Sequence, residues 1–138
     1  MGETIIEKII RHNTGKAVKP GDIVTVNVDR VMIHDIFIPF VADKFEEMGF
    51  TKLHDPDKVV LIYDHLVPAS QQDDTRHFRT GDAFAEKYGL THVHRSDGIC
   101  HQLMTEAGYV KPGHVVFGTD SHTTTYGCVG AFSTGIGY

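Results

Sequence analysis

The sequence predicts an α/β domain, a layered α/β/α arrangement with a mostly parallel sheet. Segments with helical spacing of apolar residues alternate with short apolar runs along the chain. Two of these runs, VVLIY and HVVFG, are continuously apolar, as strands covered on both faces are. Acids and histidines follow directly where such runs end. Since layered α/β sheets bind ligands beyond the carboxyl ends of their strands, this pattern favours a functional site there.

The first third of the chain predicts helix, strand and helix. Residues 4–15, TIIEKIIRHNTG, place four isoleucines on one helical face, with Thr4 as N-cap and Gly15 as the stop. After a Pro-Gly turn, residues 22–33, DIVTVNVDRVMI, are rich in valine and isoleucine and predict a strand. Residues 37–50, FIPFVADKFEEMGF, predict a second helix, with proline in the first turn and glycine as the stop.

The middle of the chain continues the alternation. Residues 58–65, KVVLIYDH, predict a buried strand, and residues 70–88 predict a helix that stops at the following glycine. Residues 90–95, LTHVHR, predict a short strand, and residues 97–109 a turn with one or two helical turns. Residues 114–120, HVVFGTD, predict another buried strand that ends in an acid.

The last segment, residues 127–138, is rich in glycine. It contains neither GxGxxG nor GxxxxGK[ST], so a nucleotide site has little support. Close packing of a helix against the sheet is the preferred explanation for its small residues. With no internal repeat or linker, residues 1–138 are expected to form a portion of a single α/β/α domain.

The composition disfavours several classes of protein, including nucleic-acid-binding, membrane-spanning and secreted proteins. The 138 residues are 41% hydrophobic and 22% charged, as in a globular domain, and the formal charge is −5 without a basic block, which disfavours a nucleic-acid partner. No segment has the length of a membrane span. The two cysteines lie far apart, and the first residues lack the apolar core of a signal peptide. These features favour a reducing, cytoplasmic setting.

Two clusters of acid and imidazole carry the functional prediction. Asp64 and His65 would leave a strand end together, and a carboxylate beside an imidazole prepares it to donate a proton. Asp120, Ser121 and His122 follow the next apolar run; on extended backbone, acid and imidazole would point the same way and hold a water or hydroxyl between them. A Ser-His-Asp hydrolase is disfavoured because no GxSxG elbow is present.

Simpler interpretations stay open for these residues. The Asp64-His65 pair could be a solvated strand end, and TTTYG a threonine-rich turn. His101, beside Cys100, could be a ligand, an acid or a buried histidine. His92 and His94 would share one face of a strand as half of a metal site, and His34 with Asp35 is a third pair at a strand end. The remaining histidines are expected at the surface: His12, His54, His77 and His114.

Four motifs taken in order resemble the N-terminal region of the aconitase and 3-isopropylmalate dehydratase family. They are VNVDRVMIHD, IYDHLVPAS, GICHQ and GTDSHTTTYGCVGAFSTGIG, and the likeness covers nearly the whole chain. The residues of these motifs resemble the large subunits of isopropylmalate dehydratase, homoaconitase or dimethylmalate dehydratase type more than mitochondrial-type aconitase. The resemblance implies an aconitase-like first domain and a hydro-lyase acting on a hydroxy di- or tricarboxylic acid.

The resemblance also implies roles for individual residues. Asp64 and His65 match the pair that delivers a proton to the departing hydroxyl, and His101 matches a pocket histidine near a [4Fe-4S] cluster. Asp120 and His122 match residues that hold the water or hydroxyl at the iron. Two further positions are expected to contact substrate: His34, where aconitases proper place a glutamine, and Ser121. The change at His34 speaks against citrate-type specificity.

Several parts that the family requires are absent from the sequence. Its three cluster cysteines come from a later SCTN-like segment and a later CxxC, and Cys100 and Cys128 do not match those positions. We therefore expect an N-terminal portion of a large subunit that binds no cluster stably and is inactive alone. Its expected partners are the hydroxy-acid substrate, the remainder of the large subunit and a small subunit with the swivelling domain. The alternative is a non-catalytic α/β module whose His/Asp clusters bind a metal or an anion.

Overall fold

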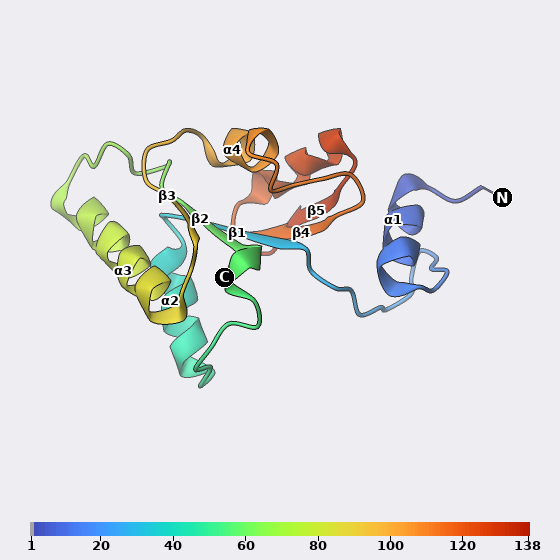
Figure 1. The fold of residues 1–138 in the computed structure, drawn as a ribbon, viewed down its shortest axis with the longest axis horizontal. Coiled ribbons are helices and arrows are strands. Elements are labelled where there is room, and N and C mark those ends of the chain that lie inside the picture. Colours follow the sequence, from blue (N-terminus) through green and yellow to red (C-terminus); the bar gives the residue numbers. More distant parts are fainter. Residues whose placement is uncertain (1) are drawn as a thin grey trace.

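A five-stranded parallel sheet forms the centre of the computed structural model, which describes residues 2–138 (Figure 1). All neighbouring strands pair in parallel, in the order β3-β2-β1-β4-β5. The strands are β1 (Arg30–His34), β2 (Val59–Ile62), β3 (His92–His94), β4 (Val115–Gly118) and β5 (Phe132–Gly135). The predicted α/β class with a parallel sheet is confirmed.

Helices cover both faces of this sheet. They are α1 (Ile5–Thr14), α2 (Ile38–Glu47), α3 (Gln72–Tyr88) and α4 (Cys100–Glu106), with the 3₁₀ helices η1 (Pro56–Lys58) and η2 (Ser121–Val129). The helices α2 and α3 pack on one face, and α4 and η2 on the other, while α1 contacts β4 and β5 (Figure 1). No helix within residues 2–138 combines the length and apolarity that a membrane crossing requires.

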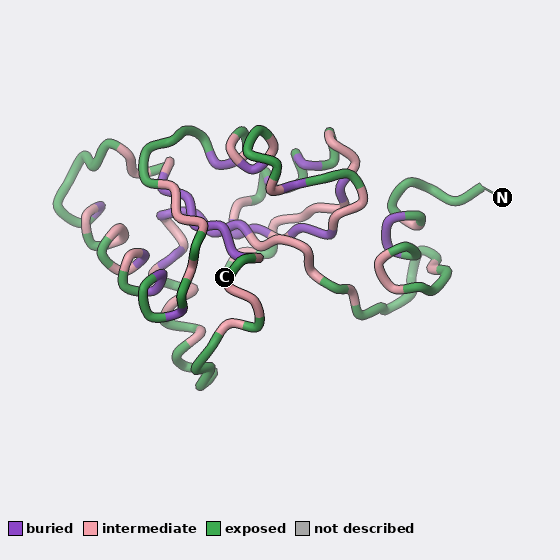
Figure 2. Tube along the Cα trace, in the orientation of Figure 1, coloured by how far each residue is buried: buried purple, intermediate pink, exposed green. Residues whose placement is uncertain are grey.

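Two apolar cores lie on the opposite faces of the sheet, because successive strand residues alternate between faces. Met32, Val60 and Ile62 pack with α4 and η2, whereas Ile33 and Leu61 pack with α2 and α3. Figure 2 shows this burial as a continuous buried band along the central strands. The sheet is therefore a rigid platform, and its carboxyl edge is free to carry polar groups.

Capping residues set the helix boundaries where the sequence has strong signals. Thr4 caps α1 in a capping box with Glu7, and Gly15 ends the helix in the left-handed conformation at φ 71°. Gly89 ends α3 in the same way at φ 70°. The predicted helices at residues 4–15, 37–50 and 70–88 are confirmed, with ends that move by a few residues.

One prediction of secondary structure is wrong. Residues 22–29 are not in a strand, and Ile23 is fully exposed. This segment reaches α1 instead, where the Asn27 backbone N–H donates to Asn13 Oδ1 at 2.7 Å and Asn13 Nδ2 donates to the Asn27 carbonyl at 2.8 Å. With these bonds made to a helix, no neighbouring strand pairs with the valine-rich run before Arg30.

The glycine-rich tail contains a strand that the sequence did not predict, whereas the predicted close packing of a helix against the sheet is found there, between η2 and β5. The strand β5 pairs with β4 in register, Gly118 opposite Gly135. A Cβ on Gly135 would lie 2.9 Å from both the Asp120 carbonyl carbon and Ser121 Cα. Glycine is needed there because the backbone of the Asp120 turn passes directly over the strand.

Candidate functional site

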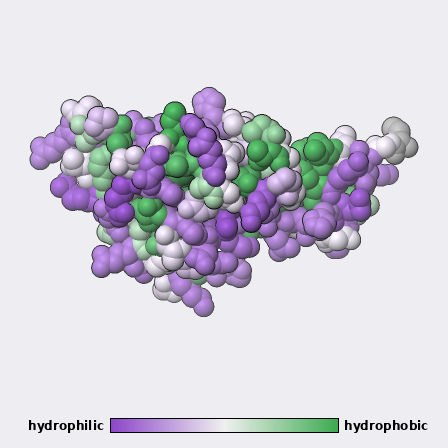
Figure 3. Space-filling model, turned by 45° about the horizontal axis from the view of Figure 1, so that its top comes forward, coloured by the Kyte–Doolittle hydropathy of each residue, from purple (hydrophilic) through white to green (hydrophobic). Residues whose placement is uncertain are grey.

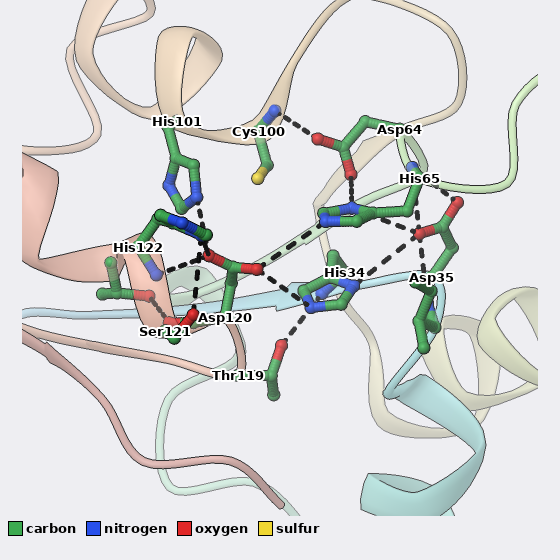
Figure 4. Close-up of polar contacts among 12 residues, drawn as sticks. His34, Asp35, Asp64, His65, Cys100, His101, Thr119, Asp120, Ser121 and His122 are labelled. Atoms are coloured by element: carbon green, nitrogen blue, oxygen red, sulfur yellow. Dashed lines mark hydrogen bonds and ion pairs between the residues drawn. The ribbon is translucent and has the colours of Figure 1, made fainter.

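The carboxyl ends of β1, β2 and β4 bring the strongest predicted site residues together. The strand order reverses between β1 and β4, and such a switch point is where α/β sheets bind ligands. His34 ends β1, Asp64 and His65 follow β2, and Asp120 follows β4. Figure 4 shows their side chains pointing toward one another, with His101 and His122 from the α4 and η2 side.

Asp120 is the centre of the cluster. Its Oδ1 lies 3.0 Å from His101 Nε2 and 3.1 Å from His122 Nδ1, and accepts the His122 backbone N–H at 2.6 Å. Its Oδ2 faces His65 Nε2 at 3.7 Å and His34 Nε2 at 3.9 Å. Burial opposes ionisation, but the bonds from His122 and His101 outweigh it and lower the pKa of Asp120. The carboxylate is thus held ionised among four imidazoles.

The backbone around Asp120 differs from the expected extended chain. Asp120 itself is extended and caps η2, whereas Ser121 and His122 form the first turn of that 3₁₀ helix. Acid and imidazole still converge, since the cap turns His122 back toward Asp120. His122 is 78% exposed, and the Ser121 hydroxyl lies 3.5 Å from its Nδ1.

Asp64 fixes the orientation of His65. Its Oδ1 lies 2.7 Å from His65 Nδ1, and its Oδ2 accepts the backbone N–H of Cys100, the first residue of α4, at 2.7 Å. With Nδ1 occupied, Nε2 of His65 is left to face Asp120. The imidazole is 31% exposed, so it stays within reach of a ligand.

His34 lies beneath His65. Its ring stacks on the His65 ring at 4.1 Å between centroids and meets Phe37 edge-on at 5.0 Å. The side chain is 1% exposed, and neither ring nitrogen has a hydrogen-bond partner. Buried polar atoms normally have hydrogen-bond partners. The two ring nitrogens of His34 have none among the described residues, so they can still bind another group.

Four contributors to the site were not assigned a role from the sequence. Asp35 binds the backbone after β2, Thr119 Oγ1 accepts the His34 backbone N–H at 3.3 Å, and the Tyr126 hydroxyl lies 3.1 Å from His101 Nδ1. The fourth is the Cys100 backbone N–H. Only Asp35 carried a sequence signal, its place in a third acid-imidazole pair at a strand end.

The other histidines lie outside this cluster. His92 and His94 do share a face, but both meet the Tyr109 hydroxyl, at 3.4 and 2.8 Å, and His94 also meets Asp97. His12 and His54 are exposed as expected. His77 and His114 are partly exposed, and His77 Nδ1 lies 3.0 Å from the Asp35 carbonyl oxygen.

Three sets of side chains bring possible metal-ligand atoms within 4.8 Å of one another. They are His34, Asp35 and His65; Asp64, His65 and Cys100; and His101, Asp120 and His122. The cysteines do not supply a cluster ligand set, because Cys100 is buried beside Asp64 and Cys128 is exposed elsewhere. Burial and the Asp64 carboxylate raise the pKa of the Cys100 thiol.

The cluster forms an open surface array. A hollow of about 240 Å³ adjoins it, lined by Asp64 together with Ser96, Gly98 and Ile99. Larger hollows of about 380 and 390 Å³ lie away from these histidines, one between α2 and α3 and one beside η1. We place the candidate site at the strand ends because the convergent polar groups lie there, and hollow size alone identifies no chemistry.

Comparisons with known proteins identify relatives of this chain. A family model described as the aconitase family (aconitate hydratase) matches residues 5–138. The chain is 43% identical over 138 residues to 3-isopropylmalate dehydratase large subunit 1 of Methanopyrus kandleri, covering 99% of this chain and 33% of that protein. It is 44% identical over 140 residues to the 3-isopropylmalate dehydratase large subunit of Moorella thermoacetica, with 99% and 33% covered. The chain spans about a third of the length of the curated relatives it matches.

Proposed function

Because the chain belongs to the aconitase family, we propose that it is part of a hydro-lyase acting on a hydroxy di- or tricarboxylic acid such as isopropylmalate. The names of the relatives support the substrate class. The observation that carries the proposal is the array in which Asp120 faces the imidazoles of His34, His65, His101 and His122. Removing water needs an acid for the departing hydroxyl and groups that hold it, and this array has both.

We propose that the chain is the N-terminal portion of a cytoplasmic large subunit. The fraction of the relatives that it covers supports a chain that is part of a longer subunit. The remainder of the large subunit and a small subunit would complete the site, and the isolated chain would be inactive. A [4Fe-4S] cluster held by that remainder would supply Lewis-acid polarisation of the substrate hydroxyl.

The Asp64-His65 pair is the proposed proton donor. Asp64 accepts from Nδ1 and holds the ring, so that a protonated imidazole presents its second N–H, at Nε2, to the departing hydroxyl. The same nitrogen faces Asp120 across 3.7 Å, so an oxygen that departs beside His65 would also lie near Asp120. After proton transfer the neutral imidazole keeps its bond to Asp64.

The proposed role of Asp120, His101 and His122 is to hold the water or hydroxyl. The carboxylate accepts hydrogen bonds, and the imidazoles on its two sides fix its orientation. The exposed Ser121 hydroxyl lies beside them and is proposed to contact the substrate. The His34 ring lies beneath the His65 ring. We propose that His34 affects the substrate through this stacking contact with His65.

The test uses the complete large subunit that carries this segment, purified anaerobically with its small subunit. Isopropylmalate and citrate are assayed as substrates for dehydration. We expect turnover of isopropylmalate, and a loss of about 10²- to 10⁴-fold in His65→Gln, as for removal of a general acid. His54→Gln, an exposed histidine outside the cluster, is the matched control. Full activity of His65→Gln would remove the proton-donor role, and no turnover by the wild type would remove the function.

The three sets of metal-ligand atoms favour a second candidate, a metal-binding module without turnover. In that case the isolated chain would retain one divalent ion, such as Zn²⁺, after dialysis, bound by His101, Asp120 and His122. Metal analysis of the wild type and of His122→Ala decides this. Stoichiometric zinc that is lost in the variant would support the module, and a metal-free wild type would exclude it.

A further inference from the structure

We propose that Asp35 is a positioning residue that holds the proton-donating histidine, His65, by its backbone. This inference rests on the proposed function for its catalytic consequence, though its structural part stands on the contacts alone. Asp35 follows the last residue of β1 and is 0% exposed. A buried carboxylate is retained only where its charge is well compensated, so its partners show what it does.

Those partners are backbone N–H groups of the loop that carries the proton donor. Asp35 Oδ2 accepts the N–H of His65 at 3.1 Å and of Leu66 at 2.8 Å, and Oδ1 lies 3.2 Å from the His65 nitrogen. Oδ1 also accepts the N–H of Ile36 at 3.0 Å. The carboxylate thus ties the end of β1 to the loop after β2, at the two residues where the backbone turns away from the sheet.

The backbone of Asp35 is fixed from two sides. Its own N–H donates to the Ile62 carbonyl at 3.1 Å, which extends the β1–β2 pairing by one residue. From α3, His77 Nδ1 lies 3.0 Å from its carbonyl oxygen. A carboxylate held so firmly can impose a position on the loop instead of following it.

Asp35 also stands behind both stacked imidazoles. Its Oδ1 lies 3.8 Å from Nδ1 of His34 and 3.8 Å from Nδ1 of His65, outside hydrogen-bond range. Burial would raise the pKa of Asp35, but its interactions with His34 and with the N–H groups of Leu66 and His65 leave that pKa below its ordinary value. The group is therefore an anion at neutral pH.

Asp64 and Asp35 divide the control of His65 between them. Asp64 sets the rotation of the ring through Nδ1, while Asp35 sets where the backbone places that ring. A misplacement of about 1 Å at a reacting group can cost about 10²-fold in rate. Loss of Asp35 should therefore reduce kcat while KM, which depends on substrate contacts made by other groups, stays nearly constant.

Asp35→Asn is the informative variant. In the wild type, both carboxylate oxygens accept backbone N–H groups. Asparagine has only one oxygen, so its amide nitrogen, a donor, would face one of these N–H donors. Asp74→Asn is the matched control, because Asp74 is also a buried carboxylate, 3% exposed. It accepts the N–H groups of Ser70 at 2.7 Å and Gln71 at 3.1 Å, which follow His65 in the same loop, and it does not contact His65. Each variant is measured by hydrogen exchange with mass spectrometry, and by steady-state kinetics in the complete enzyme.

We expect Asp35→Asn to speed exchange of the His65 and Leu66 amides by about tenfold or more, because the group that accepts both hydrogen bonds loses its charge. We expect its kcat to fall by about 10- to 100-fold with KM within about twofold. Asp74→Asn should instead speed exchange at Ser70 and Gln71 and keep both constants.

Unchanged exchange at His65 and Leu66 in Asp35→Asn would overturn the inference. Faster exchange with a kcat equal to that of Asp74→Asn would also overturn it, by leaving Asp35 a purely structural role. If the wild-type complete enzyme turned over no hydroxy acid, the proposed function would fail, while the exchange data would still decide whether Asp35 holds the loop.

Discussion

Replacing Gly135 by alanine should displace the Asp120 turn. Gly135 lies in β5, directly below the backbone that leads from Asp120 to Ser121. An added Cβ would lie 2.9 Å from the Asp120 carbonyl carbon and from Ser121 Cα, and closer still to the Asp120 carbonyl oxygen. All three atoms belong to backbone, so no side-chain rotation can relieve the contact.

The required movement follows from these distances. Ordinary contacts of a Cβ begin at 3.4 Å, so the turn and the strand must separate by about 1 Å at the carbonyl oxygen. The strand cannot give way freely, because Gly135 pairs with Gly118 and the next N–H, of Ile136, donates to the Gly118 carbonyl at 2.9 Å. Such overpacking costs about 1–3 kcal/mol of stability. A 1 Å shift would also break the 3.0 Å contact between Asp120 and His101, with a loss of about 10²-fold in kcat.

Gly127→Ala is the control for this prediction. It makes the same substitution in the same glycine-rich segment, but a Cβ there meets nothing within 4 Å. Urea unfolding followed by circular dichroism measures stability, hydrogen exchange at His122 reports on its 2.6 Å bond to Asp120, and kcat is measured in the complete enzyme. A Gly135→Ala variant with the stability, exchange and kcat of the Gly127→Ala variant would refute the reasoning.

Three further predictions concern stability and surface. Gly81→Ala should lower the stability by about 1–3 kcal/mol, because its Cβ would lie 3.0 Å from two Tyr63 ring carbons. Adding Tyr63→Phe should recover part of that stability in thermal melts, and no recovery would contradict the clash with Tyr63. Because the folded-state pKa of Asp35 is lowered, its stabilisation is complete above its unfolded pKa, about 3.9, and is lost as pH falls through the folded value. Urea midpoints should therefore fall less steeply with acid in Asp35→Asn than in the wild type. Met48 and Ile136 are 66% and 65% exposed and line an apolar hollow of about 320 Å³. The isolated chain should therefore aggregate and bind a hydrophobic dye, and Ile136→Lys should reduce both effects. A cooperative melt without dye binding would argue against this prediction.

Exposed apolar side chains also lie at the other end of the molecule. Ile5 and Ile6 of α1 are 63% and 42% exposed, although Ile9 and Ile10 on the same predicted face are buried. Figure 3 shows apolar groups at the surface in this region among hydrophilic neighbours. The helical period thus predicted the helix correctly but not how much of its apolar face is covered, because coverage depends on which strands lie beside it.

The local signals in the sequence predicted most of the elements, and the failures have a common cause. Thr4, Gly15 and Gly89 act through bonds within a few residues, so their effect can be read directly. Residues 22–29 have the composition of a strand but no strand partner, and β5 has a strand partner but little strand composition. Strand identity is decided by pairing across the sheet, which a single segment does not encode.

The same distinction explains what could be predicted of the site. Asp64, His65, Asp120 and His122 stood out because acid and imidazole are neighbours in the sequence at strand ends. Their convergence depends on the strand order, which puts β1 between β2 and β4 and so joins three strand ends that lie 30 or more residues apart.

The supporting bonds were hidden for a further reason: they join side chains to backbone. Asp35 recognises the N–H groups of His65 and Leu66, and Asp64 that of Cys100, and every residue except proline has such a group. No choice of residue at the receiving position marks these contacts in the sequence. A substitution at Asp35 therefore tests the part of the site that only the folded backbone defines, whereas one at His65 tests the chemistry that the sequence already displays.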